Sequence, residues 1–163
     1  DKKARARGTI VIYEGAPEIV LCDPSQIWVV ELWSGRVNEN AVLVTGVIDG
    51  DTIEIEGGYH VRYIGIDAPE KDEPYYWEAL QANRNLVEGK KVRLEKDVED
   101  KDKYGRLLRY VWVDNTMVNA ELVRLGYAYS YSYPPNLKYQ TYLLQMEKEA
   151  REQKRGLWGS YLD

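Results

Sequence analysis

Four carboxylates and one guanidinium group lie where two neighbouring predicted strands end. They belong to Asp49, Asp51, Asp67, Glu70 and Arg62. Carboxylates gathered at one place repel one another unless a cation lies among them, and oxygen ligands favour a hard ion such as calcium or magnesium. The planar fork of an arginine suits a phosphate oxygen. This combination suggests phosphodiester chemistry.

A second arginine, Arg106, follows a turn at another junction between turn and strand. Each of these residues also has an ordinary interpretation when taken alone. Asp49-Gly50-Asp51 is typical of a hairpin turn, Glu70 of a surface loop, and a single arginine of a solvated strand. The functional interpretation therefore depends on the groups lying together.

Hydrophobic alternation and turn residues predict the strands that must position these groups. The predicted strands are 41–49, 52–56, 60–66, 90–96 and 106–113. Gly57 and Gly58 supply a positive-φ turn, so the first three strands form an antiparallel meander. Strict alternation places residues 62 and 67 on opposite faces. They converge only if the strand bulges or ends early, and Gly65 is the expected place.

Helical spacing predicts three helices. The first begins near Asp72-Glu73-Pro74 and ends at Gly89, with Tyr76, Leu80, Asn83 and Val87 at helical spacing. Asn119 is predicted to cap a short second helix that ends at Gly126. The third spans about 139–155, with Leu143, Met146 and Ala150 on one face. Five strands with inserted and appended helices indicate an α+β protein, compatible with a five-stranded OB-fold barrel among other small barrels.

The first forty residues form a separate β-rich extension in this interpretation, and residues 41–163 form the main domain. Strands are predicted at 8–13, 18–22 and 27–33, separated by turn-forming residues. The extension could be a small added sheet, cover an edge of the barrel or contact a partner.

Composition excludes several kinds of site. The chain has 163 residues, of which 44% are hydrophobic and 30% charged, as in an ordinary globular domain. One cysteine, Cys22, and one histidine, His60, exclude an internal disulfide and a zinc cluster built from several such residues. No apolar run is long enough to span a bilayer. The net charge of −5 argues against tight non-specific binding to long duplexes.

The segments DGDT at 49–52, VRYIGIDAPE at 61–70 and DKYGR at 102–106 also carry a resemblance. Their order and rough spacing resemble the staphylococcal nuclease (thermonuclease) family. The resemblance continues through 117–119 and 122–126 to Gly156-Leu157-Trp158, so that it covers roughly residues 40 to 160. It implies the OB fold and nuclease activity.

The resemblance also implies roles for individual residues. Asp51 and Asp67 would hold a calcium ion together with the backbone carbonyl of Ala68, a position where the family often has threonine. Glu70 would orient or deprotonate the attacking water. Arg62 and Arg106 would contact the phosphate and stabilise its developing charge.

Substrate contacts are implied for Lys103, Tyr104 and one of Tyr131 or Tyr133. A lysine can meet a terminal phosphate, and tyrosines can stack on bases. Alternating tyrosines along an extended segment also have a purely structural explanation, and this alternative stays open.

The sequence therefore predicts a monomeric, calcium-dependent nuclease. It is expected to hydrolyse DNA and RNA with low sequence specificity and to prefer single strands, and the resemblance implies products with 3′-phosphate ends. Two alternatives are a non-catalytic OB module that binds nucleic acid or protein, and a phosphodiesterase acting on small nucleotides. The expected location is secreted or cell-envelope, with a cytoplasmic location as the alternative.

Overall fold

The structure, a computed structural model, describes residues 9–13, 16–20 and 41–159. The chain divides into two units, Asp1–Arg36 and Val37–Asp163. In the first unit, β1 (Thr9–Tyr13) pairs antiparallel with β2 (Ala16–Val20). Two of the predicted N-terminal strands are therefore present, although the second begins earlier than expected. The third predicted strand, at 27–33, and Cys22 lie outside the described residues.

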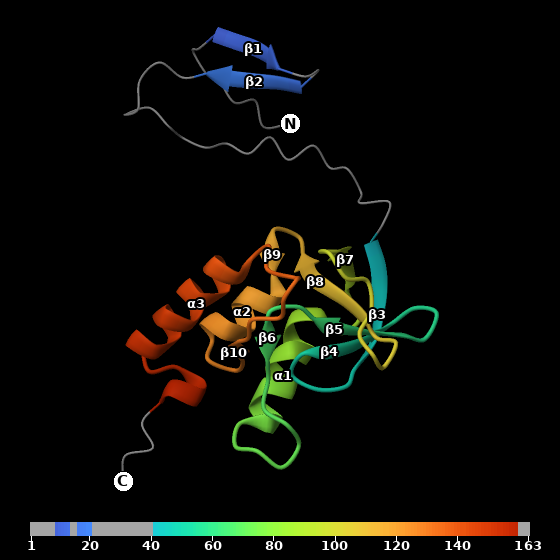
Figure 1. The fold of residues 1–163 in the computed structure, drawn as a ribbon, viewed down its shortest axis with the longest axis vertical. Helices are drawn as coiled ribbons and strands as arrows, with labels where there is room; N and C mark the ends of the chain where they lie inside the picture. Colours follow the sequence, from blue (N-terminus) through green and yellow to red (C-terminus); the bar gives the residue numbers. More distant parts are fainter. Residues whose placement is uncertain (1–8, 14–15, 21–40, 160–163) are drawn as a thin grey trace. The chain divides into compact units, whose positions relative to one another are not determined.

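The second unit is built around a closed, five-stranded mixed barrel (Figure 1). Its strands are β3 (Ala41–Val47), β4 (Thr52–Ile55), β5 (Tyr59–Tyr63), β7 (Lys91–Glu95) and β8 (Leu107–Val113). The first three form the predicted antiparallel meander, and β7 joins β3 to β8. Parallel pairing of β5 with β8 closes the barrel. The α+β class and the OB-fold barrel are confirmed.

Short-range geometry explains the meander and its interior. Gly57 and Gly58 adopt φ values of 87° and 76°, which a β-carbon would disfavour, and they form the turn between β4 and β5. The alternate residues Ile53, Val61 and Tyr63 point into the core and are at most 1% exposed. Burial of their apolar surface is the main force that holds the strands in register.

The strand that carries Arg62 ends early, as the sequence required. β5 stops at Tyr63, and a short strand β6 (Ile66–Asp67) follows. Between them, Gly65 has a φ of 79°, and a β-carbon there would lie 2.5 Å from Leu143 Cδ1. This break removes the strict alternation between Arg62 and Asp67, so the two side chains can meet. β6 pairs with β10 (Tyr129–Ser130), which places Tyr129 opposite Asp67.

Three helices and short connecting elements complete the unit. They are α1 (Tyr76–Val87), β9 (Thr116–Met117), α2 (Val118–Arg124), α3 (Gln140–Glu152) and the 3-10 turn η2 (Gly156–Trp158). Figure 1 shows α2 and α3 side by side. The face of α3 that was predicted to be buried, Leu143, Met146 and Ala150, is buried. Within the described residues, no helix is both long and apolar enough to cross a membrane.

The predicted capping role of Asn119 is wrong. Met117 is the N-cap residue of α2, and Asn119 lies inside the helix with its side chain fully buried. Its Oδ1 accepts a hydrogen bond from the Val111 N–H over 2.9 Å, and its Nδ2 donates to the Ile64 carbonyl over 2.9 Å. Asparagine is favoured at this position because it joins the helix to two barrel segments, which local sequence cannot reveal.

Candidate active site

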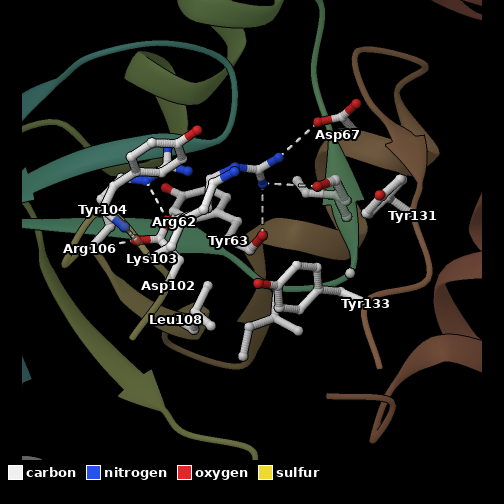
Figure 2. Close-up of a pocket in the computed structure, with 13 residues that line it drawn as sticks. Arg62, Tyr63, Asp67, Asp102, Lys103, Tyr104, Arg106, Leu108, Tyr131 and Tyr133 are labelled. Carbon is white, nitrogen blue, oxygen red and sulfur yellow. Dashed lines mark hydrogen bonds and ion pairs between the residues drawn. The ribbon is translucent and has the colours of Figure 1, made fainter. Parts of the chain in front are cut away.

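A pocket of about 410 Å³ opens beside the break between β5 and β6 (Figure 2). Its lining combines the β5–β6 segment, the turn before β8 and the segment after β10. The lining residues are Arg62, Tyr63, Ile64, Gly65, Ile66, Asp67, Asp102, Lys103, Tyr104, Arg106, Leu108, Tyr131 and Tyr133. The fold thus brings together both predicted phosphate-binding arginines, one predicted metal ligand and all four predicted substrate contacts. Asp51, Ala68 and Glu70 are not in this lining.

Arg62 is the connecting residue of the site. Its Nη1 donates to the carbonyl oxygens of Tyr63 and Ile66, each over 2.9 Å. Its Nη2 lies 2.7 Å from Asp67 Oδ1 and 3.1 Å from Asp51 Oδ2. Charge-assisted contacts of this length are strong where water is largely excluded, and only 17% of the Arg62 side chain is exposed. One guanidinium therefore clamps the β5–β6 turn and joins both predicted metal-binding carboxylates.

Asp51 is held in a buried and highly polar setting. Its Oδ2 accepts a hydrogen bond from the Ala68 N–H over 2.8 Å, and its Oδ1 accepts one from the Thr52 hydroxyl over 3.1 Å. The pKa of Asp51 is raised to about 7, mainly by burial and also by the Asp49 carboxylate, although the Arg62 guanidinium lowers it. The desolvation cost exceeds the attraction of a single guanidinium. A cation bound beside Asp51 would favour its ionised form.

The donor set fits a hard divalent cation. Oxygens of Asp51 and Asp67 both approach the same cationic nitrogen of Arg62, so both carboxylates can converge on a single positive charge. Carboxylate oxygens suit calcium or magnesium. Among the described residues, no group of three or more histidine, cysteine, aspartate and glutamate side chains is arranged to hold a metal. Backbone carbonyl, water or substrate oxygens would have to complete the coordination.

Glu70 lies apart from these contacts. It is exposed, and its backbone N–H donates to Glu73 Oε2 over 2.8 Å. Within the described part of the chain, its carboxylate makes no hydrogen bond or ion pair with another predicted site residue. The loop after Pro69 holds the backbone of Glu70, and its predicted role toward water stays a prediction.

Arg106 is oriented by Asp102, for which the sequence predicted no role. Asp102 Oδ2 accepts a hydrogen bond from Arg106 Nε over 2.7 Å. Asp102 Oδ1 accepts from the backbone N–H groups of Tyr104 and Arg106 over 2.9 and 3.0 Å. Gly105 completes the turn with a φ of 83°. The available signal was an aspartate four residues before an arginine across a glycine turn, a pattern in which aspartate often binds nearby backbone N–H groups.

The aromatic residues of the pocket differ in exposure. Tyr104 is 71% exposed, and its ring lies 4.9 Å from Lys103 Nζ and 5.6 Å from Arg106 Cζ. Tyr131 is 51% exposed, whereas Tyr133 is half-buried and packs against the core. Figure 2 shows Tyr131 and Tyr133 on the same side of the pocket. Tyr131 therefore offers the larger free surface to a ligand.

Comparison with known proteins agrees with this geometry. The family described as Staphylococcal nuclease homologue matches residues 60–160. The thermonuclease of Staphylococcus hyicus is 39% identical over 134 residues, which covers 77% of this chain and 79% of that protein. The thermonuclease of Staphylococcus intermedius is 40% identical, with coverage of 77% and 80%. The chain belongs to the staphylococcal nuclease family.

Other relatives extend this relationship beyond the staphylococci. The endonuclease YncB of Bacillus subtilis (strain 168) is 41% identical over 128 residues, which covers 72% of this chain and 61% of that protein. Membership of the staphylococcal nuclease family identifies the chain as an enzyme, a phosphodiester hydrolase of the nuclease class. The relatives named here therefore favour a catalytic domain over the non-catalytic OB module. The family is metal-dependent in character, and nucleic acids are the substrate class that it implies.

Proposed function

We propose that this chain is a calcium-dependent nuclease. Its substrates are DNA and RNA, cleaved with little sequence specificity and with a preference for single strands. The products carry a 5′-hydroxyl on one side of the cut and a 3′-phosphate on the other. The observation that carries the proposal is the convergence of Arg62, Arg106 and Asp67 on one pocket that exposed tyrosines also line.

The two arginines would bind the phosphate in different ways. Arg106 presents its Nη groups, because its Nε is bound to Asp102 and no other described residue forms a hydrogen bond or ion pair with the guanidinium. Arg62 already donates to Asp67 and to two carbonyl oxygens. It would therefore share or exchange the Asp67 contact when a phosphate oxygen arrives. Preorganised donors of this kind stabilise charge that grows on the phosphate as water attacks.

The carboxylates divide the remaining roles. Asp51 and Asp67 would hold the ion together with the Ala68 carbonyl, and the burial of Asp51 and the convergence of both carboxylates on Arg62 support this assignment. When bound, the ion would supply positive charge to the phosphate and to the attacking water. Glu70, on its exposed loop, would accept a proton from that water or orient it. Glu70 is not among the residues that line the pocket, so this role requires its carboxylate to meet the water beside the bound substrate.

The aromatic side of the pocket supports the proposed preference for single strands. Lys103 would contact a terminal phosphate, and Tyr104 and one of Tyr131 or Tyr133 would present rings to unpaired bases; Tyr131 has the larger exposed surface. Stacking on tyrosine is insensitive to base identity because every base has a π-face. Bases in a duplex are already stacked and less available. The net charge of −5 agrees with local rather than long-range attraction of nucleic acid.

The domain assignment and location form part of the same proposal. Residues 41–163 would carry the activity as a monomer, with residues 1–40 as an added β-rich extension. A site that depends on calcium suits a secreted or cell-envelope protein, because calcium-binding extracellular modules operate at high ion concentration. Fractionation of cells that produce the chain would distinguish this from a cytoplasmic location.

The decisive experiment measures acid-soluble nucleotides released from denatured DNA with calcium, with magnesium and with chelator. Wild type is compared with Glu70→Ala and Arg106→Ala. Arg109→Ala serves as the matched control, because Arg109 lies on β8, close to Arg106 in sequence, but pairs with Asp100 outside the pocket. We expect calcium-dependent release that collapses in the two site variants and persists in the control.

Three results would contradict the proposal. They are no release by folded wild type, equal release in chelator, or loss of release in the Arg109 control alone. Product ends provide a separate check, since 5′-hydroxyl ends accept a kinase label without prior dephosphorylation. Cleavage of dinucleotides as rapidly as long strands would favour the small-nucleotide phosphodiesterase instead, which the acidic net charge also suits.

A further inference from the structure

A closed ring of hydrogen bonds surrounds the turn that carries Asp51. Asn83 Nδ2, on α1, donates to the Asp49 carbonyl over 2.9 Å, and Asp49 Oδ1 accepts from the Asp51 N–H over 3.0 Å. The Asp51 carbonyl accepts from the Tyr63 N–H over 2.9 Å. The Tyr63 hydroxyl donates a hydrogen bond to Asn83 Oδ1 over 2.9 Å, and this bond closes the ring. The backbone of Asp51 is therefore held at both its N–H and its carbonyl.

Three of the four residues of the ring are buried, and Asp49 is partly exposed. Asn83 is 0% exposed, Tyr63 is 1% exposed and Asp51 is 5% exposed. A buried donor or acceptor that loses its partner bears the full cost of desolvation, so the members of the ring depend on one another. Asn83 is not among the residues that line the pocket, and it reaches the site through its hydrogen bonds with Asp49 and Tyr63.

Close packing fixes the same turn from the side of α1. A β-carbon on Gly50 would lie 2.5 Å from the β-carbon of Ala68 and 2.9 Å from that of Ala79. Ala79 precedes Asn83 by one helical turn, so both face the Asp49–Asp51 segment from one stripe of α1. The helix therefore supports the turn through a hydrogen bond at Asn83 and through contact at Ala79.

We propose that Asn83 and Tyr63 are positioning residues for the Asp51 carboxylate. This inference rests on the proposed function, in which Asp51 binds the ion. Outer residues that orient a ligand alter metal affinity even though they do not touch the metal. Loss of the ring frees the Asp51 backbone to rotate, and the carboxylate then spends less time directed toward the ion and Asp67.

The test uses two substitutions in the ring and one control substitution outside it, each made in the full chain. Tyr63→Phe removes only the oxygen that binds Asn83, and Asn83→Leu removes both side-chain hydrogen bonds. Tyr110→Phe is the matched control, since Tyr110 is also 0% exposed and donates its hydroxyl to Asp97 Oδ2 over 3.0 Å, outside the ring. Calcium binding is measured by titration calorimetry without substrate, and stability by thermal unfolding in chelator.

We expect the calcium dissociation constant to rise about tenfold in Tyr63→Phe and up to about 100-fold in Asn83→Leu. The Tyr110→Phe control should bind calcium as wild type does, even if its melting temperature falls by the same amount. Saturating calcium should restore much of the kcat of Tyr63→Phe, because the chemistry itself is intact.

Calcium affinity in Tyr63→Phe equal to that of wild type would overturn the inference, and so would equal weakening in Tyr110→Phe. Tyr63→Phe keeps the test decisive if Asn83→Leu fails to fold. Wild type that binds no divalent ion would remove the proposed metal role of Asp51 and this inference with it. Wild type that binds calcium beside variants that bind equally well would remove the inference alone.

Discussion

Arg62 Nη2 lies 3.1 Å from Asp51 Oδ2, and the two side chains are only 17% and 8% exposed. The same nitrogen lies 2.7 Å from Asp67 Oδ1. A single guanidinium thus compensates the two carboxylates to which metal binding is assigned. Removing one partner from a buried ion pair leaves an uncompensated charge, which costs more than the pair itself contributes.

Arg62→Met should therefore destabilise the protein in chelator by about 2 kcal/mol, less than a fully buried pair because Asp67 is half exposed. Added calcium should raise the melting temperature more in Arg62→Met than in wild type, because the ion takes over the compensation of both carboxylates. The measurement is thermal unfolding with chelator and with calcium. Arg109→Met loses an ion pair outside the pocket, and calcium should raise its melting temperature by the same amount as in wild type. If calcium raised the melting temperature equally in all three proteins, the ion would not be replacing Arg62 in compensating the two carboxylates.

Asp102→Asn should reduce activity by misorienting Arg106. Asparagine keeps an oxygen for the backbone N–H groups of Tyr104 and Arg106, but it replaces the acceptor that binds Arg106 Nε with a donor. We expect kcat/KM on denatured DNA to fall about tenfold to 100-fold, less than the loss caused by removing a whole charge-stabilising donor group. Arg106→Ala provides that comparison. An Asp102→Asn enzyme with wild-type kcat/KM would show that Arg106 needs no such support.

The same aspartate makes stability depend on acid pH. Burial raises the pKa of Asp102, but hydrogen bonds from the Arg106 side chain and from the N–H groups of Arg106 and Tyr104 outweigh it, so the pKa lies below its usual 3.8. A carboxyl with a lowered folded-state pKa contributes stability above its unfolded-state pKa, and this contribution disappears as pH falls through the folded-state value.

Wild type should thus exceed Asp102→Asn in free energy of unfolding by about 1 kcal/mol at neutral pH. The gap should close as the pH falls below the usual pKa of 3.8. Urea unfolding of both proteins across this range measures it. A gap that stays constant into strong acid would mean that the charge of Asp102 does not support the turn.

Tyr131→Ala should weaken substrate binding more than it slows chemistry. Tyr131 is 51% exposed in the pocket, and loss of one base-stacking ring costs about 1–3 kcal/mol. KM for single-stranded DNA should rise about fivefold or more, with kcat little changed. Tyr142→Ala is the control, because Tyr142 is 44% exposed on α3 outside this pocket. A fall in kcat alone would assign Tyr131 to the reacting groups instead.

Local sequence patterns were sufficient for most of the barrel. Period-two alternation and the Gly57-Gly58 turn predicted the meander, and the buried face of α3 followed from helical spacing. These features depend on residues close in sequence, because burial of their apolar side chains determines which face of the strand or helix points to the core. Asn119 was wrongly predicted as a helix cap because its partners, Ile64 and Val111, lie on other elements.

The sequence by itself determined the kinds of group present: oxygen ligands, two arginines and several tyrosines, together with a glycine where the strand had to break. Only the tertiary structure decided which of them meet. It placed Arg62 between Asp51 and Asp67, tied Arg106 to Asp102 and bound the Asp51 turn to Asn83 on α1. The reason is that the residue types in a sequence directly specify which functional groups the chain carries. Distances between segments far apart in the chain depend instead on how the whole core packs.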